Sequence, residues 1–326
     1  MTEKKKTEFV GMLHIPINSI VTAPASWQDA LGLPSATAGD WEIIASMDDV
    51  GCDPGRRREL HFLAERLSFY TYLKDRMIRE ASLYSKYNAD AMLLENTGAP
   101  YFVRGHQPAV IFAVMSCLAG ELRAEFPESR FGIQVLAFSD DLAMEIAVQN
   151  RFSFIRSESA LFEGVRPEGR TPNYGNLAKL YMQRNMLTAL DDRYDGPLVL
   201  VDIQKKHTEY AASLQRMETW FDNVMFQKIE GVVLTGPETG SPVAEDDFRK
   251  TVSFLNELKA KYDDSPFKSC IPLLYLGSGV SKENIAVCRR YADGVIVGSS
   301  LKEHGYWELP IKEETLKQFM EKWHEE

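Results

Sequence analysis

The chain has 326 residues, of which 44% are hydrophobic and 26% charged, proportions that suit a globular protein with one large core. Its formal net charge is −10 and no basic cluster follows residues 4–6, which disfavours nucleic acid or an anionic membrane surface as a partner. No apolar stretch is long enough to cross a bilayer, and the N-terminus lacks a signal-peptide pattern. The four scattered cysteines form no Cys-x-x-Cys pair, so we expect reduced thiols in a cytoplasmic protein.

Short apolar runs alternate with longer segments along the whole chain. We expect the runs to be buried parallel strands, in chain order at residues 9–15, 89–96, 131–136, 152–156, 197–202, 231–236, 272–277 and 293–298. Apolar residues that return every three or four positions predict helices at 108–125, 140–150, 176–194, 209–228, 244–262 and 282–291. Eight alternating units in a chain of this length favour a closed (β/α)8 TIM barrel over an open doubly wound sheet.

The regular pattern fails between residues 16 and 53, where Pro, Ser, Ala, Thr and Gly are common and no period persists. We interpret residues 16–53 as a long insertion after the first strand, within a single domain that spans residues 1–326. Trp27 and Trp41 suggest that part of it packs. Because long loops in compact folds are usually functional or disordered, the insertion is expected to cover the site as a lid or to lie on a partner.

Two small-residue turns follow the last two predicted strands: Gly277-Ser278-Gly279 and Gly298-Ser299-Ser300. In TIM barrels the loops after strands 7 and 8 commonly bind a phosphate through backbone N–H groups, and glycine lets an anion come close. The two turns therefore predict a site for a phosphate monoester. The alternative is that both are only tight connections between a strand and a helix.

Several of these segments together resemble one known family. They are Val10 to His14, Glu95-Asn96 with Pro100 to Phe102, Phe154 to Arg156, Asp202 to His207, Leu234 to Gly240, Gly277 to Gly279 and Asp293 to Lys302. The chain resembles the BtpA family of (β/α)8-barrel proteins, named for a cyanobacterial factor needed for photosystem I accumulation. The resemblance implies the barrel and a site built from the matching residues. The chain departs from the family pattern at residues 16–18, where the insertion begins.

Polar residues at the ends of the predicted strands are the candidates for chemistry, because the C-terminal ends of barrel strands point toward the active-site mouth. Glu95 and Asp202 are predicted to share general acid and base roles. Lys205 would stabilise an enolate or oxyanion, or form a Schiff base. The alternative for Asp202 is an internal ion pair with Arg156 or a lysine. The other predicted substrate contacts are His14, Arg156, His207 and Thr235.

Other ligands are less well supported by the sequence. His14, Glu95, Asp202 and His207 would be the ligands of a metal, but no His-x-His or His-Glu-x-x-His run accompanies them, so we predict no metal. The glycine-flanked loop that begins at Thr235 would bind sugar hydroxyls, although an ordinary Pro/Gly turn explains its composition equally well. The sequence indicates no particular cofactor.

Two functions are compatible with this pattern. The first is an enzyme that acts on a small phosphorylated metabolite, a sugar phosphate or a phosphoribosyl compound, by isomerisation, aldol cleavage or hydrolysis. The second is a non-catalytic assembly or regulatory factor that binds another protein through residues 16–53, since a fold does not determine a function. For a barrel of this size we also expect a homo-oligomer with cyclic symmetry.

Overall fold

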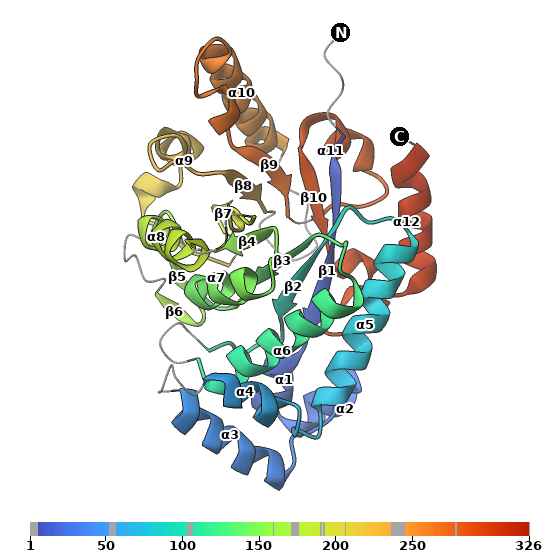
Figure 1. Ribbon diagram of the computed structural model, residues 1–326. Coiled ribbons are helices and arrows are strands. Elements are labelled where there is room, and N and C mark those ends of the chain that lie inside the picture. The colour runs from blue at the N-terminus through green and yellow to red at the C-terminus, as the bar shows by residue number, and fades with distance from the viewer. Residues whose placement is uncertain are drawn as a thin grey trace.

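The computed structural model describes residues 6–51, 57–102, 107–158, 160–170, 176–189, 191, 193–205, 207–235, 245–277 and 279–325, with only the backbone at 51, 57, 170, 176, 245 and 247. The described residues form a closed parallel barrel with the strand order β1-β10-β9-β8-β7-β4-β3-β2 (Figure 1). The TIM-barrel prediction is confirmed. The strands are β1 (Glu8–Ile15), β2 (Ala91–Asn96), β3 (Phe131–Gln134), β4 (Phe154–Ser157), β7 (Leu198–Ile203), β8 (Gly231–Leu234), β9 (Leu273–Leu276) and β10 (Gly294–Val297).

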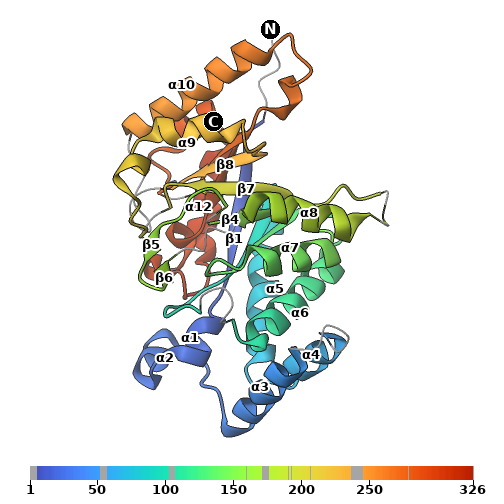
Figure 2. The same cartoon turned by 90° about the vertical axis from the view of Figure 1, so that its left-hand side faces the viewer.

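Helices surround the barrel and connect its strands (Figure 2). They are α5 (Tyr70–Lys86), α6 (Ala109–Glu125), α7 (Asp140–Gln149), α8 (Asn176–Thr188), α9 (Met217–Val224), α10 (Glu245–Tyr262), α11 (Ile285–Tyr291) and α12 (Glu313–Glu325). The short 3-10 helices are η2 (Ala212–Leu214), η3 (Lys268–Cys270), η4 (Ser299–Leu301) and η5 (Glu303–Gly305). Among the residues in this description, none of the helices is long and apolar enough to span a membrane.

The predicted helix at 209–228 is wrong in its first half. The backbone N–H and C=O of Glu209 both bond to Val165, which belongs to the two-stranded hairpin of β5 (Val165–Arg166) and β6 (Gly169–Arg170). A residue whose backbone groups pair with another strand cannot also form helical bonds. The chain therefore becomes helical only at η2 and α9. The helix predicted at 176–194 also ends early, at Thr188.

The segment in which no period was expected contains short helices. They are α1 (Ile17–Thr22), α2 (Ala25–Leu31) and α3 (Ala38–Gly51), followed by α4 (Arg57–Ala64). Gly32 ends α2 with a φ of 63°, and Thr37 and Asp40 form a reciprocal cap at the start of α3. There the Thr37 N–H donates to the Asp40 carboxylate at 2.7 Å, and the Asp40 N–H donates to Thr37 Oγ1 at 3.2 Å. These local caps mark where α2 ends and α3 begins, and apolar periodicity does not reveal such boundaries.

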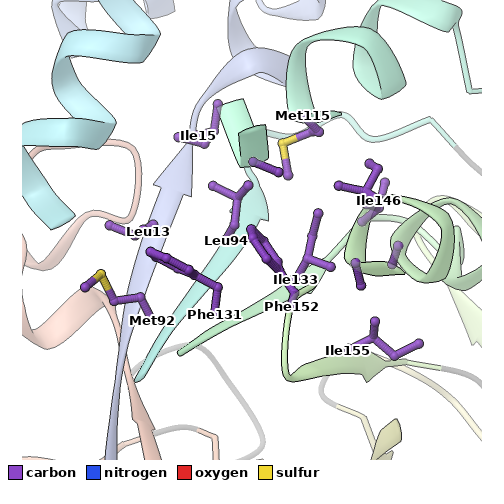
Figure 3. Packing of buried hydrophobic residues seen from close by; sticks show 14 of the residues in the cluster. Leu13, Ile15, Met92, Leu94, Met115, Phe131, Ile133, Ile146, Phe152 and Ile155 are labelled. Atoms are coloured by element: carbon purple, nitrogen blue, oxygen red, sulfur yellow. The ribbon is translucent and has the colours of Figure 1, made fainter. Parts of the chain in front are cut away.

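The core has two parts, separated by the strands. Outward side chains such as Leu94 and Ile133 pack against α6 and α7, where Met115 and Ile146 meet them (Figure 3). Inward side chains form a smaller apolar cluster inside the barrel, made of Val10, Met12, Ala91, Leu93, Phe154, Leu200, Val233, Tyr275 and Ile296. This filling closes the barrel from within, so a ligand can bind only above it, at the mouth.

Candidate active site

A layer of polar side chains lies directly above the apolar filling of the barrel. Parallel pairing places His14 beside Glu95, and Glu95 beside Gln134. Arg156 and Asp202 follow two positions after the inward Phe154 and Leu200, so strand alternation turns them inward as well. All five side chains are buried. The sequence pattern predicted four of them from their positions at strand ends and missed Gln134.

A cavity of about 450 Å³ opens above this layer at the mouth of the barrel. Its lining brings together most of the predicted residues: His14, Glu95, Arg156, Lys205, His207, Gly277, Gly279, Gly298, Ser299 and Ser300. Ser278 lies outside the described residues. Asp202 and Thr235 are not among the described residues of the lining. Thr235 follows β8, and its buried Oγ1 has no hydrogen-bond partner in the described part of the chain.

Asp202 forms the internal ion pair that the sequence left as an alternative. Its carboxylate accepts from Arg156 Nε at 3.0 Å and lies 2.7 Å from Lys205 Nζ. Burial alone would raise the pKa of Asp202, but the charges of Arg156 and Lys205 hold it below its ordinary value. Asp202 therefore stays ionised and keeps both cations in place. A carboxylate held in this way is a weak base.

The hairpin after β4 contributes charged residues that the sequence analysis missed. Arg166 donates to Glu158 at 2.6 Å, and the Glu158 carboxylate also lies 3.4 Å from Lys205 Nζ. Burial would raise the pKa of Glu158, but Arg166 and Lys205 lower it below its ordinary value. Glu168 lies 3.3 Å from Arg166 Nε. The usable signal was the sequence from Arg166 to Gly169, in which Pro and Gly indicate a turn between charged residues.

The two predicted glycine turns provide space beside the polar layer. A Cβ at Gly298 would lie 2.7 Å from His14 Cε1, and a Cβ at Gly277 would lie 2.7 Å from a Val233 methyl and 3.1 Å from an Arg156 guanidinium nitrogen. Gly279 has a φ of 65°, which favours glycine. Gly277 and Gly298 directly follow β9 and β10, and the absence of a Cβ at these positions leaves room for the side chains of Arg156 and His14 at the mouth.

Aromatic residues form another part of the wall. Tyr101 and Trp307 meet edge to face, with 6.4 Å between ring centroids, and both line the cavity. Trp307 was not predicted, because it lies in a loop rather than at a strand end, and Tyr101 was included only within the segment Pro100 to Phe102 of the family resemblance. On the neighbouring strands β1 and β2, His14 Nε2 lies 3.8 Å from Glu95 Oε1. Within the described residues, no three His, Cys, Asp or Glu side chains are grouped so as to hold a metal ion.

The two buried carboxylates that are ion-paired with cations, Asp202 and Glu158, should make the stability of the protein depend on pH. Asp202 and Glu158 have ordinary pKa values of 3.8 and 4.5, and both are lowered in the folded protein. Below these values the unfolded chain binds more protons than the folded one, so the free energy of unfolding falls as pH falls. In Asp202→Asn the free energy of unfolding should fall less steeply as pH falls, because up to one proton fewer is taken up when the chain unfolds. Urea unfolding between pH 7 and pH 3 measures it, and an unchanged slope would contradict the ion-pair assignment.

Comparison with known proteins agrees with the barrel. Residues 68–325 match the BtpA family model. An uncharacterized protein of Archaeoglobus fulgidus is 30% identical over 231 residues, 71% of this chain and 82% of the relative. The photosystem I biogenesis protein BtpA of Synechocystis is 27% identical over 236 residues, 72% of this chain and 74% of the relative.

Among solved structures, KGPDC from Streptococcus mutans aligns with a TM-score of 0.46 and 10% identity, over 76% of this chain and 90% of that chain. A similarity at this level carries no information about a ligand. The family match, in contrast, begins shortly before α5 and extends through α12, so it covers all of the barrel except β1. The sequence match over most of its length shows that this chain belongs to the BtpA family.

Proposed function

We propose that this protein binds a small phosphorylated metabolite, a sugar phosphate or a phosphoribosyl compound, and acts on it by acid/base chemistry at the mouth of the barrel. One observation carries the proposal. The two glycine turns line the same cavity as Glu95, Arg156 and Lys205, so an anion-binding corner and candidate catalytic groups share one space. A phosphate held at the turns fixes the rest of the ligand against these side chains.

The phosphate is assigned to the turns rather than to the cations. Gly298 precedes the 3-10 helix η4, and Gly277 and Gly279 lie beside it in the lining. Main-chain N–H groups at such turns can hold phosphate oxygens. Arg156 and Lys205, in contrast, belong to the polar layer, where they pair with buried carboxylates and where we place the reacting end of the ligand.

The chemistry is assigned to the polar layer. In the proposed reaction, the Glu95 carboxylate takes a proton from a carbon next to a carbonyl group. The electron pair of the broken C–H bond moves toward the carbonyl oxygen, where Arg156 and Lys205 stabilise the negative charge. Glu95 lies close enough to Arg156 to help raise its pKa, after Asp202 and against the effect of burial. Asp202 is then a positioning residue for the two cations. Isomerisation uses such a step, whereas aldol cleavage reaches the same kind of enolate when a base takes the proton of the β-hydroxyl group and the C–C bond breaks.

Binding at the turns is testable with Ser299, a half-buried residue of the lining. We expect sugar phosphates to raise the melting temperature of the wild-type protein, by the equivalent of about 2.7 kcal/mol at a ligand concentration of 100 times Kd. Ser299→Asp adds a negative charge at the turn and should weaken binding about tenfold or more. Calorimetric titration measures the dissociation constants of the wild-type protein and of Ser299→Asp.

Ser299→Ala is the matched control, because it keeps the backbone N–H groups and adds no charge. Its affinity should stay close to that of the wild-type protein. If Ser299→Asp bound phosphate esters as tightly as Ser299→Ala, the phosphate would lie elsewhere. If no phosphate ester bound the wild-type protein at all, the proposed function would be wrong.

A further inference from the structure

A second cavity of about 690 Å³ adjoins the first. We propose that it holds a heteroaromatic ring of the same ligand, so that the protein binds a nucleotide-like compound, a ribosyl phosphate that carries a base. This inference rests on the proposed function and names the class of compound bound at the same site. The proton-transfer step of that function applies to such a compound when its ribose ring is open, because only then does the sugar carry a C=O or C=N group next to a C–H bond.

The two cavities share one stretch of wall. Ala99, Tyr101, Pro167 and Glu168 line both of them. The second cavity extends from this shared wall to α1 and α2, where Ser19, Trp27 and Leu31 line it. Figures 1 and 2 both place α1, α2 and the β5–β6 hairpin at the end of the barrel toward which β1 runs. We place the ligand so that it passes these shared residues from the first cavity into the second.

The size of the space argues for a ligand with two parts. Sites for small molecules usually measure about 300–1,000 Å³, and the first cavity alone, at about 450 Å³, already suits a sugar phosphate. A sugar phosphate anchored at the glycine turns leaves the second cavity empty. A ligand with a further ring beyond its sugar occupies both.

The walls of the second cavity favour a flat ring. Trp27 is 65% exposed although it lines a largely apolar cavity, and Pro24, Pro100 and Pro167 add flat faces around it. An exposed indole beside a binding cavity is the type of surface on which bases stack. A polyol would leave this surface without an apolar partner.

The polar groups of the second cavity favour a ring that carries N–H groups. Glu168 and Glu308 line it, and burial raises the pKa of the half-buried Glu308 above its ordinary value. Carboxyl groups accept hydrogen bonds from ring N–H and amino groups. Glu168 also faces Arg166, so Glu308 is the group that gains most from such a bond, and a purely aliphatic ligand would offer it none. A nitrogen-containing aromatic ring satisfies both the flat walls and the carboxyl groups.

The test compares ligands with and without a base, measured by calorimetric titration of the full-length protein. The probes are ribose 5-phosphate and the monophosphates of adenosine, guanosine, cytidine and uridine. We expect at least one nucleoside monophosphate to bind about tenfold or more tightly than ribose 5-phosphate, since stacking on an aromatic side chain contributes about 1–3 kcal/mol per base.

Trp27 and Trp41 provide a matched pair of variants. Both are exposed tryptophans between β1 and α4, but Trp41 lies on α3 and is not among the described residues that line either cavity. Trp27→Ala should lose about tenfold in affinity for the nucleotide and nothing for ribose 5-phosphate. Trp27→Phe should keep most of the wild-type affinity for the nucleotide. Trp41→Ala should bind both ligands like the wild-type protein.

The outcomes separate this inference from the proposed function. If ribose 5-phosphate binds and no nucleotide binds more tightly, the second cavity does not hold a base, while the proposed function stands. If Trp27→Ala and Trp41→Ala weaken nucleotide binding equally, Trp27 has no specific role and the inference is overturned. If neither class of ligand binds, the proposed function fails and this inference fails with it.

Discussion

Asp202→Asn is expected to lower the free energy of unfolding by about 3–5 kcal/mol, the usual cost of removing one partner from a buried ion pair. Asp202 is 1% exposed and neutralises both Arg156 and Lys205. The amide of Asn fills the same space but carries no charge, so the variant leaves two cations buried with less compensation. Urea unfolding at pH 7 measures the difference.

Two further variants test whether the loss of stability comes from the buried ion pair. Asp263→Asn removes an exposed carboxylate that pairs with Lys268, so it should leave stability unchanged within error. Adding Lys205→Met to Asp202→Asn removes one of the two uncompensated cations and should recover part of the loss. A loss below about 1 kcal/mol in Asp202→Asn would show that the two cations do not depend on this carboxylate.

Glu80→Gln is expected to lower the free energy of unfolding by a similar amount, roughly 3–5 kcal/mol, although Glu80 is not among the described residues that line the cavity at the mouth. Glu80 lies on α5 and is 1% exposed. Its carboxylate pairs with Lys302 and with Arg76 Nε at 3.3 Å, and it accepts the Ile311 N–H at 3.2 Å. It thereby ties α5 to the segment between β10 and α12. Without its charge, the buried cations Lys302 and Arg76 repel each other.

The pH dependence distinguishes this mechanism from a simple packing defect. Burial lowers the pKa of Lys302 to about 8, well below its ordinary value of 10.5. Above about pH 8 the amine becomes neutral and no longer needs a counter-charge, so the difference between Glu80→Gln and the wild-type protein should shrink as pH rises. A difference that stays constant from pH 7 to pH 9.5 would contradict the electrostatic account. Glu313→Gln, which removes an exposed partner of Lys86, is the control and should show no measurable change.

The barrel could be predicted from sequence because its strands are buried on both faces. Runs such as Leu198–Ile203 are apolar almost throughout, and such runs separated by helical segments indicate parallel strands. The helices α1 and α2 could not be found in the same way. They have only six and seven residues, too few for a period to stand out.

Some residues of the candidate site could likewise be predicted from the sequence, and others could not. Residues at strand ends, such as Glu95 and Arg156, were predictable because the strand itself fixes where they point. Glu158, Arg166 and Trp307 were not, since they lie in loops or in the β5–β6 hairpin, whose path is set by tertiary packing. Asp202 shows a further limit. Its position could be predicted, but its engagement with two cations depends on Lys205, whose loop folds back over the strand end.

The chain of alternating charges at the mouth has a consequence for selectivity among anions. Arg156, Lys205 and Arg166 each already face a carboxylate of their own, from Asp202, Glu158 or Glu168. An approaching dianion therefore meets little excess positive charge and is recognised by shape and by the direction of hydrogen bonds. A mouth that is electrically balanced before its ligand arrives does not collect the abundant inorganic anions of its surroundings.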